Sequence, residues 1–218
     1  MSDKALTHHE VTGLANPELA AFEVHGMTRS SFILRGALAA GAFYGTSAVT
    51  PFVSQALAAS GAGDVEILNF ALTLEYLEAD FYTVKGNEVS LSGQARAYAT
   101  QFGQEESEHV TALTAAIKQL GGKPVKKPKF AFPGSNESSF LALASVLENT
   151  GVGAYNGAAP AIQDKQVLAS AGSIVQIEAR HAAAIDLLIG RSPTPSEGFD
   201  TPLTKAQVLA KAGPLIKA

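Results

Sequence analysis

Two stretches of the sequence place a glutamate three residues before a histidine. In QEESEHVTAL, Glu106 precedes His109, and in QIEARHAAAI, Glu178 precedes His181. Both stretches share the order Gln, any residue, Glu, any two residues, His. Residues at positions i and i+3 lie on one face of a helix, so a carboxylate and an imidazole at this spacing can bind the same metal ion. The repeat therefore predicts metal-binding chemistry.

Two further glutamates repeat with almost the same interval. The step from Glu75 to Glu148 is longer by a single position than the step from His109 to His181. Each of these glutamates is followed seven residues later by a tyrosine, Tyr82 or Tyr155. Seven residues are about two helical turns, so each tyrosine shares a helix face with its glutamate and could hydrogen-bond a metal ligand. The residues predicted to bind metal are Glu75, Glu106, His109, Glu148, Glu178 and His181.

Each of these residues, taken singly, has an ordinary alternative explanation. A single Glu-x-x-His is common on helix surfaces, and Glu105 and Glu108 are interpreted as surface residues of this kind. Glu75 could be paired with an arginine or stay protonated, and Glu78 competes with it for the inward position. The interval to the tyrosine favours Glu75, so Glu78 is expected beside the ligands, as the tyrosines are. The two tyrosines could be core aromatics. Only the repetition of the whole set favours the metal site.

Four carboxylates in one apolar interior need compensating charge. They would repel one another and lose hydration, at a cost of several kcal/mol per ion. Two divalent cations would neutralise them. Carboxylate and histidine ligands suit iron or manganese, and open coordination positions would admit oxygen or hydrogen peroxide. Gly151 and Gly153, close to Glu148, could leave room beside the ions or could only let helices approach closely.

The composition limits the classes of function. The chain has 218 residues, of which 46% are hydrophobic and 17% charged, which suits one domain with appendages around a sizeable core. Its net charge of −4 offers no general basic face, so we expect no nucleic-acid partner. There is no cysteine, which excludes disulfides, thiolate zinc sites and iron–sulfur clusters. A metal ion must therefore be bound by oxygen and imidazole nitrogen.

The apolar periodicity predicts the helices that must position these residues. We expect helices from Asp64, as the N-cap, to Gly86, from about Ser92 to Leu120, from about Glu137 to Ala158, and from about Asp164 to Ile189. The segment between the second and third helices, residues 121–136, holds three prolines and three glycines, and only its KFAF stretch has strand character. When extended it reaches roughly 50 Å, enough to cross a helix of about 42 Å. Two helical hairpins joined by a long crossover predict an all-α, ferritin-like four-helix bundle.

Residues 1–59 are interpreted as an N-terminal tail and an export leader. From Thr28 the chain has an arginine, then the alanine-rich run SSFILRGALAAGAFYGTSAV, then small residues in SQALAAS. This is the layout of a signal peptide. Thr28, Arg29 and Phe32 resemble the twin-arginine pattern T-R-R-x-F-L, although Ser30 replaces the second arginine and one residue is inserted before the leucine. An uncleaved membrane anchor and a buried N-terminal helix are the alternatives.

The predicted organisation is thus a tail and leader (residues 1–59), a bundle (residues 60–190) and a C-terminal tail (residues 191–218). The C-terminal tail contains a proline-rich loop and a short amphipathic helix, about Thr204 to Ala212, that we expect to pack on the bundle.

Two stretches carry a resemblance to a known family. LNFALTLEYLEADFY and FDTPLTKAQVLAKAGPLI resemble the bacterial and fungal ferritin-like domain family often labelled desiccation-related. The resemblance covers roughly residues 64–216 within the ferritin and rubrerythrin superfamily. It implies a centre of two iron or manganese ions bound by the six residues predicted above.

These features favour an exported oxidoreductase that reduces oxygen or hydrogen peroxide in stress protection. Iron oxidation, peroxide reduction and catalase activity fit the same ligands, and no catalytic residue is assigned. The alternative is a non-catalytic stress or desiccation-related protein whose metal holds the fold together. Iron storage in a shell is disfavoured because a leader would have to enter the assembly. A homo-oligomer is left open, and contact with a membrane is expected only through an uncleaved leader.

Overall fold

The structure is a computed structural model, and it describes residues 63–194 and 198–217. The predicted tail and leader lie outside the described residues. The helices are α3 (Asp64–Asp80), α4 (Gly86–Glu88), α5 (Gly93–Gln119), α6 (Glu137–Ala158), α7 (Lys165–Leu188) and α8 (Lys205–Ala212), and two short strands are β1 (Lys129–Phe130) and β2 (Ile216–Lys217). None of the helices in this part of the chain is both long and apolar enough to cross a membrane.

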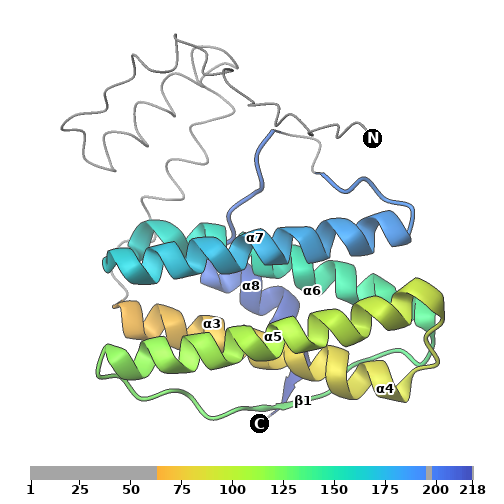
Figure 1. Ribbon diagram of the computed structural model, residues 1–218, viewed down its shortest axis with the longest axis horizontal. Helices are drawn as coiled ribbons and strands as arrows, with labels where there is room; N and C mark the ends of the chain where they lie inside the picture. The colour runs from red at the N-terminus through yellow and green to blue at the C-terminus, as the bar shows by residue number, and fades with distance from the viewer. Residues whose placement is uncertain (1–62, 195–197, 218) are drawn as a thin grey trace, which may run out of the picture. The chain divides into compact units, whose positions relative to one another are not determined.

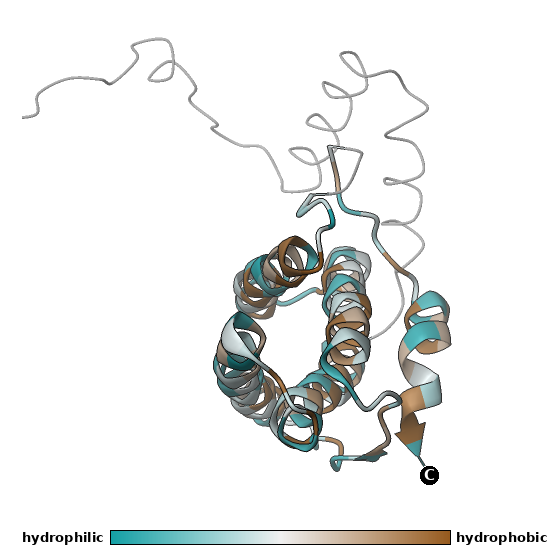
Figure 2. Cartoon of the chain, turned by 90° about the vertical axis from the view of Figure 1, so that its right-hand side faces the viewer, coloured by the Kyte–Doolittle hydropathy of each residue, from teal (hydrophilic) through white to brown (hydrophobic). Residues whose placement is uncertain are grey.

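The four long helices form two hairpins that pack together. α3 packs along α5, α6 packs along α7, and contacts between α3 and α6 and between α5 and α7 join the hairpins (Figure 1). Viewed from the side of that picture, the four helices surround a common interior, and α8 lies beside them (Figure 2). The predicted all-α four-helix bundle with a long crossover is confirmed.

A layer of polar side chains divides the bundle interior into two apolar clusters. Toward one end of the bundle, residues such as Leu72, Ile117 and Val167 form one cluster. Toward the other end, residues such as Phe81 and Ile185 form the second. Each long helix contributes to both clusters, so each helix also crosses the layer between them. The ionisable residues predicted from the sequence lie in that layer.

The crossover is fastened to α3 by polar contacts. The side chain of Asn69 accepts a hydrogen bond from the backbone N–H of Val125 at 2.7 Å and donates to the carbonyl of Lys123 at 3.2 Å. Lys127 forms an ion pair with Asp80 further along the helix. Strand β1, within the KFAF stretch, pairs antiparallel with β2 at the chain's C-terminal end. These contacts hold the long connection without any regular structure of more than two residues.

The C-terminal tail belongs to the same core as the bundle. Thr204 and Gln207 form a capping box at the start of α8, and Val208 is fully buried in the second apolar cluster. Just before α8, the backbone N–H of Leu203 donates to the carbonyl of Gly153 at 2.8 Å. A Cβ atom on Gly153 would lie 2.6 Å from the side chain of Leu203. Gly153 therefore lets the tail approach α6 and does not make room for metal ions.

Two predicted helix boundaries are wrong. Gly63, not Asp64, caps α3, and the carboxylate of Asp64 instead accepts the backbone N–H groups of Gln163 and Asp164 before α7. Gly86 does not end the first helix, because its backbone stays helical and the chain continues through α4. Between α3 and α4, residues 81–85 form a π-helical turn, a feature often found at functional sites.

Candidate metal centre

Seven ionisable side chains occupy the polar layer, and we call them the central cluster. All are buried, the most exposed being His109 at 9%. The members of the central cluster are Glu75 and Glu78 from α3, Glu106 and His109 from α5, Glu148 from α6, and Glu178 and His181 from α7. The six residues predicted to bind metal are therefore brought together, and Glu78 joins them.

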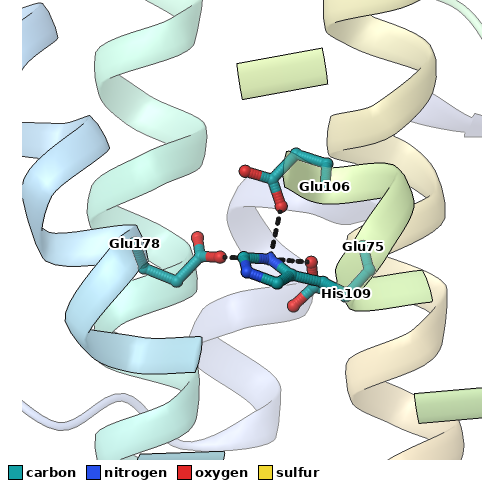
Figure 3. Close-up of side chains that lie close together, drawn as sticks. All are labelled: Glu75, Glu106, His109 and Glu178. Carbon is teal, nitrogen blue, oxygen red and sulfur yellow. Dashed lines mark hydrogen bonds and ion pairs between the residues drawn. The ribbon is translucent and has the colours of Figure 1, made fainter. Parts of the chain in front are cut away.

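The first set of contacts is arranged around His109. Its Nδ1 atom lies 3.1 Å from Glu75 Oε2, 2.9 Å from Glu106 Oε2 and 3.2 Å from Glu178 Oε1 (Figure 3). The four residues come from three different helices, and each offers one donor atom within 4.8 Å of the others. Such a set of one imidazole and three carboxylates could hold one metal ion.

A second set is arranged around His181 and shares a residue with the first. The Nδ1 atom of His181 lies 2.9 Å from Glu106 Oε1 and 3.4 Å from Glu148 Oε2. These three residues also offer donor atoms within 4.8 Å of one another. Glu106 thus directs one oxygen toward each histidine and could contribute a donor atom to both sets.

Glu78, expected beside the ligands, also offers a donor atom of its own. Glu78, Glu148 and Glu178 form a third set with donor atoms within 4.8 Å. On α6, Gly151 occupies the position three residues after Glu148, as Glu78 does after Glu75 on α3. A Cβ atom on Gly151 would lie 2.7 Å from Glu178 Oε2 and 3.4 Å from Glu78 Oε1. The missing side chain therefore leaves space for these two carboxyl groups.

The two tyrosines contact the cluster in a crossed arrangement. The Tyr82 hydroxyl donates to Glu148, and the Tyr155 hydroxyl donates to Glu75, so each bonds the glutamate of the opposite hairpin. Burial raises the pKa of both tyrosines well above the ordinary value of 10.0, and the neighbouring carboxylates raise it further. Both hydroxyls therefore remain protonated donors.

Glu105 was expected on the surface, and it is partly exposed there but also contacts a histidine of the central cluster. Its side chain is 33% exposed, but its Oε2 atom lies 2.6 Å from Nε2 of His181. The ring of Phe102 stacks on the same imidazole with centroids 3.9 Å apart. The sequence contained no signal for the Glu105 contact, because it depends on how α5 and α7 face each other. Glu108 is exposed, as expected.

Most carboxyl groups of the cluster hold protons more tightly than usual. Burial raises the pKa of Glu75 to about 8 and that of Glu148 to about 7, although the adjoining histidines oppose the shift. Burial also raises the pKa of Glu78 and Glu178 well above 4.5, and neighbouring carboxylates raise both further. Without a cation, the cluster thus relieves its own repulsion by binding protons.

The pKa shifts of Glu106 and the two histidines favour their charged forms. Although burial raises the pKa of Glu106, the adjoining imidazoles of His109 and His181 lower it to about 2. Burial lowers the pKa of each histidine, but the adjoining carboxylates raise it to about 12 for His109 and about 11 for His181. These protons compete with metal ions for the same groups, since a ligand must lose its proton to bind metal.

Within the described part of the chain, several buried polar atoms of the central cluster lack a hydrogen-bond partner, although a metal ion could bind them. Among the described residues, no hydrogen-bond partner reaches Glu106 Oε1, Glu148 Oε2, either oxygen of Glu178, or Nδ1 of His181. Glu106 Oε1 and His181 Nδ1 lie close but are not aligned for a hydrogen bond. An unsatisfied buried polar atom is costly. The residues present therefore fit a centre of oxygen and imidazole ligands.

Comparison with known proteins supports the fold. A family model described as "Ferritin-like domain" matches residues 63–191, which span the four long helices and every member of the central cluster. A search of curated proteins found no match.

Proposed function

The chain belongs to the ferritin-like domain family, and on that premise we propose that it binds two iron or manganese ions and reduces oxygen or hydrogen peroxide. The observation that carries the proposal is the pair of overlapping donor sets that share Glu106. One position would use Glu75, Glu106, His109 and Glu178. The other would use Glu106, Glu148 and His181, with Glu178 and Glu78 beside it.

Side chains of the protein would position the ligands of this centre and shield it from water. Bound redox-active ions would supply the electrons for reduction of oxygen or peroxide. Tyr82 and Tyr155 would hold Glu148 and Glu75 in place through their hydroxyl hydrogen bonds. The apolar clusters on both sides would keep bulk water away, which strengthens electrostatic interactions within the layer.

The biological setting is part of the proposal. The leader-like residues 28–59 favour action outside the cytoplasm, in the periplasm, the envelope or the surroundings of the cell. The resemblance to desiccation-related ferritin-like proteins favours a role in stress protection, where removing peroxide or oxygen protects the envelope.

The near-complete burial of the cluster favours a second candidate. Glu106, Glu148 and Glu178 are 0% exposed, as expected for an enclosed ion that only holds the bundle together. In that case the protein would bind metal and act through its surface without turnover.

Metal analysis and reactivity separate the two candidates. Anaerobically prepared full-length protein should contain two iron or manganese ions per chain by elemental analysis. Its absorbance should change on adding oxygen or peroxide and return on adding a reductant. Glu106→Ala and Glu178→Ala should abolish binding of both ions, whereas Glu108→Ala, an exposed residue of the same helix as Glu106, should leave it unchanged.

A stable metal content without any response to oxygen or peroxide would favour the structural ion. Fewer than one ion per chain, unchanged by Glu106→Ala, would overturn metal binding altogether.

A further inference from the structure

We propose that Glu105 is a positioning residue that makes the two ion positions unequal. The position formed by His181, Glu148 and Glu106 would bind its ion more tightly than the position at His109 and would fill first. This inference rests on the proposed function, because it requires that two ions bind.

Glu105 determines which nitrogen of His181 faces the cluster. A carboxylate oxygen accepts the hydrogen bond from an imidazole N–H, so the contact of 2.6 Å keeps a proton of His181 on Nε2. When the ring gives up its other proton to bind metal, Nδ1 becomes the nitrogen with the free lone pair, and it faces Glu106 and Glu148 at 2.9 and 3.4 Å. The imidazole is thereby prepared in the form that binds metal.

Further contacts fix both partners. The second oxygen of Glu105 accepts a hydrogen bond from Gln101 Nε2 at 3.1 Å, which holds the carboxylate against α5. Phe102, one helical turn away from Glu105, stacks on the imidazole with an interplanar angle of 23°. The imidazole is therefore restrained both at its outer nitrogen and on a ring face.

The other histidine lacks this support. In the part of the chain that the structure describes, His109 makes polar contacts through Nδ1 only, to carboxylates of the central cluster. The internal repeat that aligns His109 with His181 also aligns Glu105 with Ile177 on α7. An isoleucine cannot accept a hydrogen bond, so the sequence itself breaks the symmetry of the two hairpins at this position.

A carboxylate that accepts from a ligating histidine orients the ring and raises its basicity. Loss of such a partner typically lowers metal affinity by about 10- to 100-fold. We therefore expect Glu105 to strengthen the His181 position by roughly this factor, relative to a chain without it.

The test is a calorimetric titration of metal-free full-length protein with Co²⁺, with the visible absorption of the bound ion recorded in parallel. Wild type should show two steps of unequal affinity. His181→Gln should remove the tighter step and His109→Gln the weaker one. Glu105→Gln should weaken the tighter step by about 10- to 100-fold and change its absorption, leaving the weaker step in place. Glu105→Ala should weaken it further, since it also removes the acceptor atom.

Glu108→Gln is the matched control. Glu108 lies on the same helix, carries the same charge, and accepts from Gln104 at 3.2 Å just as Glu105 accepts from Gln101. It contacts no histidine among the described residues, so its replacement should leave both steps unchanged.

The outcomes distinguish this inference from the proposed function. Two binding steps that Glu105→Gln and Glu108→Gln affect equally would overturn the role of Glu105 and leave the metal centre intact. Loss of the weaker step in His181→Gln would overturn the assigned order. A wild-type protein that binds no ion would overturn both proposals.

Discussion

Glu75 and Glu148 illustrate, at the scale of single residues, how the central cluster depends on protons. Their pKa values of about 8 and about 7 in the folded chain exceed the ordinary value of 4.5. At pH values between 4.5 and these raised pKa values, the folded metal-free chain keeps protons that the unfolded chain releases. Stability falls as pH rises wherever the folded state binds more protons.

Metal-free protein should therefore lose stability as pH rises from 4.5 to about 8. The raised pKa values of His109 and His181 act in the same direction above pH 6.5, and the lowered pKa of Glu106 acts against them only below 4.5. Urea unfolding at a series of pH values measures the trend. A flat profile would show that the carboxyl groups are not clustered.

Metal-loaded protein is the control for the same series. A bound cation keeps its ligands ionised and competes with protons, so metal affinity rises with pH. The difference in unfolding free energy between loaded and metal-free protein should thus widen from about pH 5 upward.

Tyr82 gives a second prediction at the scale of residues. Replacing it with phenylalanine removes the hydroxyl that donates to Glu148 and leaves the ring in its apolar surroundings. Hydrogen bonds to charged groups contribute about 1.5–3 kcal/mol, so Tyr82→Phe should lower the unfolding free energy by up to that amount. The loss should be largest in metal-loaded protein, where Glu148 is ionised.

Tyr98→Phe provides the matched control, because the Tyr98 hydroxyl makes no hydrogen bond to the described residues and only its ring packs, against Phe102. Equal effects of the two substitutions in chemical denaturation would mean that the Tyr82 hydroxyl contributes nothing specific.

The sequence predicted the members of the central cluster better than it predicted the residues that hydrogen-bond to them. Duplication made the six ligand candidates visible, since chance rarely repeats glutamate, histidine and tyrosine at matching intervals. Glu105 had no such signal, because it belongs to a charged helix face and its partner is 76 residues away. The exchange of partners between Tyr82 and Tyr155 also depends on helix packing, which spacing along one helix cannot reveal.

At the scale of elements, helix α6 has a glycine, Gly151, at the position where a side chain would collide with the central cluster. A Cβ atom on Gly151 would meet the end of the Glu178 side chain, 2.7 Å from its Oε2 atom. Gly151→Ala should therefore displace this carboxylate while disturbing little of the apolar packing. We expect metal affinity to fall by at least about tenfold, as for other disturbed ligand shells.

Gly172→Ala, in α7, is the matched control for this substitution. Apart from the backbone of its own helix and the two chain neighbours, no described atom lies within 4 Å of the added Cβ position, and alanine is favoured over glycine in a helix interior by about 0.8–1 kcal/mol. It should stabilise the protein and leave metal affinity unchanged in the same titration. Unaltered metal binding in Gly151→Ala would show that Glu178 is not held where a ligand must be.

Helices were easier to predict than their ends. A period of 3.6 residues over more than 20 positions identifies a helix whatever its exact termini. The first helix differs at both ends because tertiary contacts decide them. The Asp64 carboxylate binds the turn before α7 and is not used as a cap. At the other end, a π-helical turn carries the chain past Gly86. Close approach of α5 at Gly103 accompanies that turn, since a Cβ atom there would lie 3.0 Å from Thr83.

At the scale of the whole molecule, metal binding should raise the melting temperature, Tm. A ligand that binds only the folded state adds about 2.7 kcal/mol when present at 100 times its Kd. For a chain of this size each kcal/mol raises Tm by about 2–4 °C, so the increase should be roughly 5–11 °C. Differential scanning calorimetry with Mn²⁺ or anaerobic Fe²⁺ measures it. Mg²⁺, which prefers oxygen ligands and retains its water, serves as the control ion.

A Tm that does not depend on Mn²⁺ or Fe²⁺ concentration would contradict a centre coupled to folding. A shift retained in Glu106→Ala would place the bound ions outside the central cluster.

The fate of residues 1–59 is the remaining prediction for the whole molecule. Within the described residues, the apolar clusters and the central cluster are built from residues 65–216, so removal of a leader would leave them complete. We expect the protein recovered from outside the cytoplasm to begin within or just after the SQALAAS stretch. Mass spectrometry of the intact chain measures this directly.

Variants of the leader separate cleavage from anchoring. A small residue is required before the cleaved bond, so Ala58→Gln should leave the leader attached and the protein bound to the membrane fraction. Ala59→Gln, one residue further on, changes the chain equally but spares the A-x-A pattern, and should be processed normally. Full-length protein in the soluble cytoplasmic fraction would support a buried N-terminal helix, because an export leader would direct the chain out of the cytoplasm.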